Sequence, residues 1–309
     1  MILALRYANA GTAAAYPLEC HGQLDWQVSA NKHKASIKLP EIPAGAILVP
    51  SLSLLSDDDY KFQFVLKLGS HRWPLHPVPC DSAPESEPNA AVSTHIDCFH
   101  VHEDLHAPEL EIEIVGLRHL TDYLLTATAR PLELTEIPAP STNCLCAAPP
   151  AITQKSAGSK LGPRVCSPTC IAMLLKQFGK EADLWAVSAA CFDPTTKLYG
   201  IWPLALRAAS REGCLGAVEV FDDWRDPQHI IEAGVPLVAS IRFATGGLPD
   251  APLTATGGHL VVLHGIGPEE VRVCDPAAAR TAVVPRVYDT PHFGRAWLEH
   301  RGAAYILLP

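Results

Sequence analysis

The sequence predicts an α+β protein in which an amino-terminal antiparallel β-sandwich precedes a domain of helices followed by an antiparallel sheet. Short runs of alternating polar and apolar residues, separated by Pro, Gly and Asp, fill residues 1–134, a pattern typical of sandwiches. Residues 153–309 show apolar residues at helical spacing first and extended apolar runs afterwards. Between them, residues 135–152 are rich in Pro, Ala and Ser and lack periodicity, which indicates an interdomain linker.

The composition limits the partners that the chain can bind. It has 309 residues, 48% of them hydrophobic, and a formal net charge of −9 without any basic run. Nucleic acid is not an expected partner, because phosphate binding needs clustered positive charge. No apolar run approaches the roughly 20 residues that a membrane helix needs. We therefore expect a protein that neither binds nucleic acid nor inserts into a membrane.

The first residues and the cysteines favour a cytoplasmic protein. Met1–Tyr7 has no basic stretch before its apolar residues, so we expect a first strand there and no signal peptide. The ten cysteines are irregularly spaced, and we interpret most of them as reduced core residues. Their even number stays compatible with disulfides, and an export signal upstream stays compatible with the sequence.

Strands dominate the expected first half. They cover residues 47–55, 60–68, 110–115 and 123–129. The run Asp57–Asp59 between the first two predicts a turn, since a calcium loop would need a glycine and a distal glutamate at EF-hand spacing. Residues 79–88 are expected to form an exposed loop.

Helices come first in the expected second half. One begins after Cys166, with Ser167 as its N-cap and Pro168 at its first position. Gly179 is placed to end this helix. The further expected helices are 181–190, 201–212, 226–233 and 292–299, and the expected strands are 215–221, 236–243, 259–263, 271–275, a segment around Val283, and 304–308.

Three residue types in chain order suggest nucleophilic catalysis. Cys166 opens a helix, whose positive end stabilises a thiolate. His259 begins a strand after two glycines, and Asp275 ends the next strand. A cysteine nucleophile needs an imidazole to move its proton, and the imidazole needs an acceptor on its other nitrogen. Because 265–269 predicts a turn, the two strands should pair and hold His259 beside Asp275. Gln154 is the candidate side chain for stabilising an oxyanion.

The residues that carry a resemblance extend over about 150–309. They are Gln154, Val165-Cys166-Ser167-Pro168-Thr169, Ala172-Met173, Gly258-His259-Leu260-Val261-Val262-Leu263, Gly265, Val273-Cys274-Asp275-Pro276-Ala277-Ala278, Arg286-Val287-Tyr288, Phe293, Ala296-Trp297 and Tyr305-Ile306. In these residues the chain resembles papain-like cysteine peptidases, and more narrowly the bacterial peptidase family thirty-nine-like domains, relatives of the bacteriocin double-glycine leader peptidases. It departs from many members in having Cys-Ser-Pro instead of Cys-Gly-Pro.

The resemblance implies a papain-like cysteine peptidase domain with a Cys-His-Asp triad. Cys166 would be the nucleophile, His259 the base, Asp275 the residue that orients the imidazole, and Gln154 the oxyanion donor. The implied reaction is cleavage of a peptide or amide bond through a thioester acyl-enzyme, without metal or organic cofactor. The loop 244–258, which precedes His259, is expected to shape access for the substrate.

Several candidates have simpler explanations. Cys170 is expected to be a core residue, with a redox pair to Cys166 as the alternative. His264 competes with His259, but five residues along a strand it should point to the opposite face. The cluster His95, Cys98, His100, His102 and His106 could bind zinc. Its spacing matches no zinc motif, which favours a solvated, half-polar strand.

Two other functions are compatible with the same residues. A triad of this kind can pass its acyl group to an amine, as in transglutaminase or phytochelatin-synthase type transferases. The chain could also be a binding module that keeps the fold without turnover. The sequence does not discriminate among substrates or oligomeric states.

Overall fold

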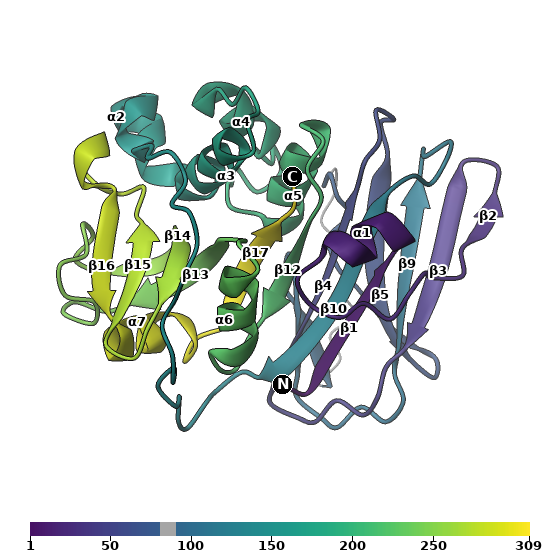
Figure 1. Cartoon of the computed structure of the whole chain (residues 1–309). Coiled ribbons are helices and arrows are strands. Elements are labelled where there is room, and N and C mark those ends of the chain that lie inside the picture. The colour runs from purple at the N-terminus through teal and green to yellow at the C-terminus, as the bar shows by residue number, and fades with distance from the viewer. Residues whose placement is uncertain (81–90) are drawn as a thin grey trace.

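The first half of the chain forms two antiparallel five-stranded sheets. The computed structural model describes residues 1–80 and 91–309, so most of the expected loop 79–88 lies outside the described residues. The first sheet has the order β1 (Leu3–Ala8), β10 (Tyr123–Pro131), β4 (Ala46–Leu54), β8 (Phe99–Val101) and β7 (Val92–Thr94). The second has the order β2 (Gln27–Ser29), β3 (Lys32–Lys38), β9 (Glu109–Val115), β5 (Lys61–Leu68) and β6 (His71–Pro74). Figure 1 shows both sheets beside the second half of the chain.

One hydrophobic cluster joins these two sheets. Leu48 and Leu52 from β4 pack in it with Phe62, Phe64 and Ile112 from the second sheet. The two runs around Asp57–Asp59 do not pair with each other, because β4 belongs to the first sheet and β5 to the second. Every residue of β4 is buried, since its other face packs against the second half of the chain. Burial on both faces explains why β4 lacks the alternating pattern seen in β5.

The second half is built on a seven-stranded antiparallel sheet. Its order is β12 (Gly216–Val220), β17 (Ala303–Leu307), β13 (Leu237–Phe243), β14 (Thr256–Ile266), β15 (Glu270–Cys274) and β16 (Pro285–Asp289), and β11 (Cys144–Leu145) also pairs with β14. The helices α3 (Cys166–Gln177), α4 (Leu184–Ala190) and α5 (Trp202–Arg211) share one cluster with the sheet. The helices α6 (Arg225–Glu232) and α7 (Thr290–Trp297) share another. Figure 1 shows the two helix groups on opposite sides of the sheet.

The other helical elements of the described residues are short. They are α1 (Ala10–Ala15), η1 (Gln154–Ala157), α2 (Gly158–Leu161), η2 (Gly162–Arg164) and η3 (Thr281–Val283). The segment 135–152, predicted to be a linker, contributes β11, whose Cys144 and Leu145 pair with Ile266 and Gly265. No helix among residues 1–80 and 91–309 is long and apolar enough to cross a membrane.

Two local predictions were wrong. The helix α3 begins at Cys166, with Val165 and not Ser167 as its N-cap. The Ser167 hydroxyl instead bonds the Tyr305 hydroxyl of β17 at 3.0 Å, a contact between residues far apart in sequence. The segment around Val283 is a 3-10 turn, and the strand begins only at Pro285. The other elements of the second half differ from the predicted bounds by a few residues at their ends.

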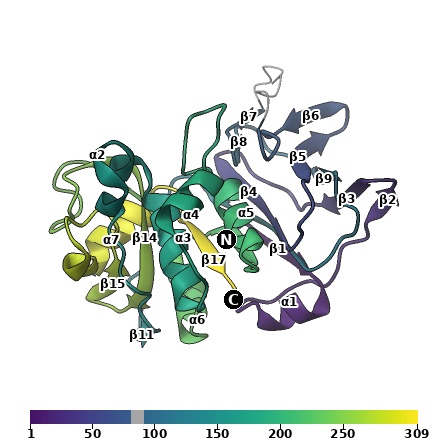
Figure 2. The same cartoon turned by 90° about the horizontal axis from the view of Figure 1, so that it is seen from above.

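The two halves meet where β12 lies against β4 and β10. Hydroxyl groups of Ser53, Ser51 and Thr128 accept hydrogen bonds from the N–H groups of Gly216, Val218 and Val220, at 3.0–3.1 Å. The side chains thus satisfy backbone groups of a strand that has a partner strand on one side only. Figure 2 shows α5 and β4 side by side at this junction.

Buried arginines hold the same junction. Arg6 of β1 donates to both carboxylate oxygens of Glu219 at 2.7 Å, and Tyr16 donates to Glu219 at 2.8 Å. Arg130 of β10 donates to the carbonyls of Phe221 and Leu298 at 2.8 and 2.6 Å. A buried charge needs such bonds to offset its lost hydration. The amino-terminal half is therefore fixed to the second half by polar contacts inside the molecule.

Candidate active site

Cys166 is the first residue of α3 and is half-buried. The helix packs its buried residues between α4, α5 and β14. A helix of 12 residues places its positive dipole end at the thiol. The sequence folds this way because the apolar residues of α3 cover the sheet, which leaves its first residue at the edge of the core.

His259 and Asp275 lie together at the end of two paired strands. β14 and β15 run antiparallel, with Val262 opposite Cys274. The His259 Nε2 atom lies 2.8 Å from the Asp275 Oδ1 atom, and both residues are almost completely buried. Because Nε2 is engaged by Asp275, Nδ1 is the ring nitrogen left for the hydrogen bond between His259 and the Cys166 thiol.

The Asp275 carboxylate has two further donors. The Tyr288 hydroxyl of β16 donates to Oδ2 at 2.7 Å, and the Ala277 N–H donates to Oδ1 at 2.9 Å. These bonds hold the carboxylate in one orientation toward the imidazole. Sequence reasoning included Tyr288 only in the resemblance and gave it no role. Apart from that match, nothing in its strand distinguishes it from a core tyrosine.

The pKa values of the three residues shift in the directions that favour charge. Burial would raise the pKa of the Cys166 thiol, but the hydrogen bond and charge of His259 and the backbone near Leu260 and Ser167 lower it below the ordinary value. Burial would lower the pKa of His259, yet Asp275 and Cys166 raise it to about 10. Burial would raise the pKa of Asp275, but His259, Tyr288 and the Ala277 N–H keep it low. The arrangement therefore favours the charged form of each of the three groups: thiolate, imidazolium and carboxylate.

Gln154 lies beside this group but has no hydrogen bond to Cys166 in the structure. Its backbone N–H donates to the Pro276 carbonyl at 2.9 Å, directly after Asp275. The backbone carbonyl of Gln154 packs closely against Gly162. A Cβ atom added at Gly162 would lie 3.0 Å from the Gln154 carbonyl oxygen. The side chain is buried, and its Oε1 has no hydrogen-bond partner among the described residues.

Cys166 faces a cavity of about 860 Å³ whose walls come from both halves of the chain. Gly257 and Gly258 of β14 line it, but residues 244–256 do not, so the expected role of loop 244–258 is limited to its last residues. The segment 198–202 and Arg164 form another side, where Arg164 stacks over the Tyr199 ring at 5.1 Å. The amino-terminal half contributes His95, Ile96, Asp97, His100, Leu132 and Glu133.

The competing candidates occupy other environments. Cys170 is fully buried, its thiol lies 3.4 Å from the Leu260 carbonyl oxygen, and burial raises its pKa strongly. His264 has a buried Nδ1 without a partner among the described residues, at a register shift of β14. His102 bonds Ser93, and Cys98 lies in the core. Within residues 1–80 and 91–309, no group of three or more His, Cys, Asp or Glu is arranged to hold a metal ion.

Comparison with known proteins places the second half in one family. The model of the Peptidase_C39 like family matches residues 149–305. A crystal structure of a double glycine motif protease from an AMS/PCAT transporter, in complex with the leader peptide, is 18% identical, with a TM-score of 0.38, and the match covers 54% of this chain and 94% of that one. A crystal structure of a C39-like peptidase from Bacillus anthracis is 16% identical, with a TM-score of 0.42, over 54% of this chain and 98% of that one. No curated protein matches the chain.

A cysteine at the head of a helix, facing a histidine on an antiparallel sheet, is the arrangement of the cysteine peptidase-like class. Within that class, the chain belongs to the Peptidase_C39 like family, whose model covers 149–305. The matched region includes the helices α3–α7 and almost all of the strands β12–β17.

Proposed function

We propose that the chain is a cysteine peptidase that cleaves peptide or amide bonds through Cys166, His259 and Asp275. The observation that carries the proposal is the position of His259, which bonds Asp275 at 2.8 Å with one nitrogen and reaches the Cys166 thiol with its ring. The lowered pKa of Cys166 favours the thiolate, and a thiolate is the nucleophilic form.

The proposed reaction has two steps. The Cys166 thiolate attacks the substrate carbonyl carbon, and the His259 imidazolium donates its proton to the leaving amine, which leaves a thioester. His259 then takes a proton from water, and the hydroxide attacks the thioester carbonyl. The acid product leaves and the thiol returns. Asp275 stays ionised throughout and stabilises the imidazolium.

We infer that Gln154 stabilises the oxyanion in both steps. Three features support this role: its burial, the Oε1 without a partner among the described residues, and the anchoring of its backbone beside Pro276 and Gly162. The backbone N–H of Cys166, at the start of α3, would be the second donor.

We further propose two domains, 1–134 and 153–309, connected by 135–152. The single cluster shared by the two amino-terminal sheets supports a β-sandwich for the first domain. Its contribution to the wall of the Cys166 cavity supports a role in substrate binding.

The test is the rate of iodoacetamide alkylation at pH 6, resolved for each cysteine by mass spectrometry. An ordinary thiol has a pKa of about 8.5 and reacts slowly at this pH. We expect fast labelling of Cys166 that is lost in His259→Ala. Cys146 is an internal reference, because it is half-buried and burial raises its pKa to about 11. Slow labelling of Cys166, equal in both proteins, would reject the ion pair and favour a binding module.

Transfer to an amine is the alternative reaction of the same thioester. Incubation with a mixed peptide library, with and without added glycinamide, discriminates between the two. Hydrolysis gives free carboxylates under both conditions. Products heavier by the amine, formed at the expense of the acid, would assign a transferase.

A further inference from the structure

Arg301 is one of the cations that line the cavity, and hydrogen bonds hold both ends of the turn that carries it. It lies in the turn between α7 and β17 and lines the same cavity as Cys166. Arg130 donates to the Leu298 carbonyl at the start of this turn, and Phe221 donates to the Gly302 carbonyl at its end. The guanidinium lies 5.9 Å from the centre of the Trp202 ring. The turn and the aromatic ring therefore determine the position of the Arg301 guanidinium.

The guanidinium of Arg301 has no hydrogen-bond or ion-pair partner in the part of the chain that the structure describes. Its charge lies near Asp97, but that carboxylate already accepts from the Trp202 N–H and the Cys98 thiol. Glu133 and Glu299 also line the cavity, and both are exposed, where solvent screens them. The five N–H donors of the Arg301 guanidinium therefore have no bonded acceptor among the described residues.

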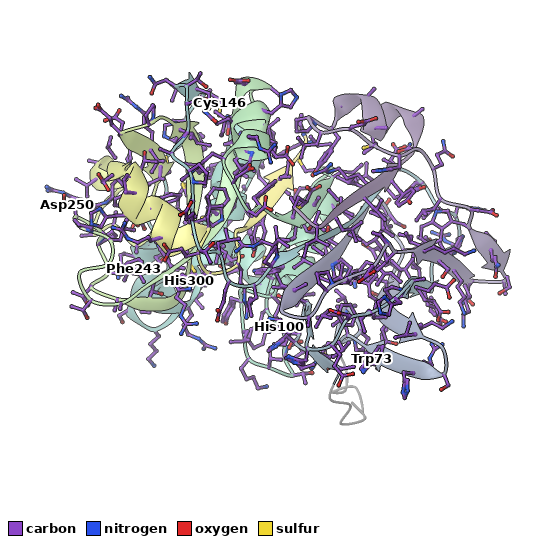
Figure 3. All side chains as sticks on the ribbon, turned by 90° about the horizontal axis from the view of Figure 1, so that it is seen from below. Trp73, His100, Cys146, Phe243, Asp250 and His300 are labelled. Carbon is purple, nitrogen blue, oxygen red and sulfur yellow. The ribbon has the colours of Figure 1, made fainter. Side chains whose placement is uncertain are left out.

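His100 offers a second unbonded group in the wall of the same cavity. It comes from β8 in the amino-terminal half and lines the cavity, and its Nε2 is buried without a partner among the described residues. Burial, then His95 and then Arg301 lower its pKa to about 4, so the ring is neutral and can donate from one nitrogen. Figure 3 labels His100 and His300, which line this cavity from the two halves.

We propose that Arg301, with His100 as a second donor, binds a carboxylate of the substrate in the cavity that contains Cys166. The carboxylate is an Asp or Glu side chain or the end of a peptide chain, since both present the same planar acceptor to a guanidinium. The proposal rests on the proposed function only in that Cys166 is the reacting group. It makes the amino-terminal half part of the substrate site.

The test uses three electrophilic peptides that alkylate Cys166 from within the cavity. They are iodoacetyl-Gly-Gly-Glu amide, with a side-chain carboxylate; iodoacetyl-Gly-Gly-Gln amide, which is neutral; and iodoacetyl-Gly-Gly-Gln free acid, with a terminal carboxylate. Probes with one and three glycines vary the reach. The readout is the rate constant for alkylation of Cys166 by each acidic probe, divided by the rate constant for the neutral probe. This ratio corrects for any change in the reactivity of the thiol.

We expect at least one acidic probe to react about three- to tenfold faster than the neutral probe at low salt, the range for one charge-assisted contact that solvent partly screens. In Arg301→Gln the ratio should fall to about one, and in Arg301→Lys, which keeps the charge without the fork, it should be intermediate. Arg295→Gln is the matched control: it removes the same charge from an exposed position on α7 outside this cavity, and it should keep the ratio.

Two results would overturn the proposal: a ratio near one for both acidic probes at every spacer length in the wild type, or a preference that Arg301→Gln leaves unchanged. A preference for the Glu probe alone assigns a side-chain carboxylate, and one for the free acid alone assigns a chain end. The ratio is measured at pH 6 and at pH 9. At pH 9 even an ordinary thiol ionises. A failure of the thiolate–imidazolium pair is therefore recognised separately, because the neutral probe would then label Cys166 slowly at pH 6 but not at pH 9.

Discussion

Replacing Arg6 by Met should destabilise the protein by about 3–5 kcal/mol, because it leaves a buried carboxylate without its cation. Glu219 is completely buried, and both of its oxygens accept from Arg6 at 2.7 Å. After the change only the Tyr16 hydroxyl still bonds it closely. Urea unfolding at pH 7, followed by circular dichroism, measures the loss.

Two further variants make this prediction specific. Arg6→Met combined with Glu219→Met should recover most of the stability, because a buried ion pair often contributes little compared with apolar residues. Arg118→Met removes an exposed partner of Asp58 and should cost less than about 1 kcal/mol. The reasoning is refuted if Arg6→Met costs no more than Arg118→Met, or if the double variant is as unstable as Arg6→Met alone.

Three more predictions concern the site and its frame. Asp275→Asn should slow iodoacetamide labelling of Cys166 at pH 6 by roughly tenfold or more, because losing the carboxylate lowers the pKa of His259 and with it the thiolate fraction; an unchanged rate would contradict this. Gln154→Ala should reduce hydrolysis of any cleaved peptide about 10²- to 10³-fold but leave alkylation unchanged, since alkylation forms no oxyanion; parallel losses would reject the role. Gly302→Ala should lower stability by more than about 2 kcal/mol, because its φ is +60° and a Cβ would collide with the Phe221 carbonyl oxygen. Gly257→Ala, with nothing within 4 Å, is its control in thermal melting.

Local patterns were enough to predict most helices and strands of the second half. The buried face of α3 and the burial of β13 and β14 leave a pattern of apolar residues that can be read directly from the sequence. The pairing of β14 with β15 followed from the turn between them. These are contacts between segments that are close along the chain.

The remainder depends on residues far apart in sequence. The start of α3 was misplaced because Tyr305, over a hundred residues away, takes the Ser167 hydroxyl. The bond from Tyr288 to Asp275 and the contribution of His100 to the cavity likewise need the assembled fold. A polar residue in a strand gives no signal of which distant partner it will meet, so these contacts were beyond a single sequence.

The hydroxyl groups of Ser51, Ser53 and Thr128 have a consequence for how the protein can be divided. They cover backbone donors along β12, the last strand on one side of the seven-stranded sheet. A fragment that begins after residue 150 would expose those donors together with the bare carboxylate of Glu219. Uncovered strands of this kind recruit strands from other molecules. The amino-terminal half therefore also acts against self-association, and proteolytic separation of the halves should lead to aggregation.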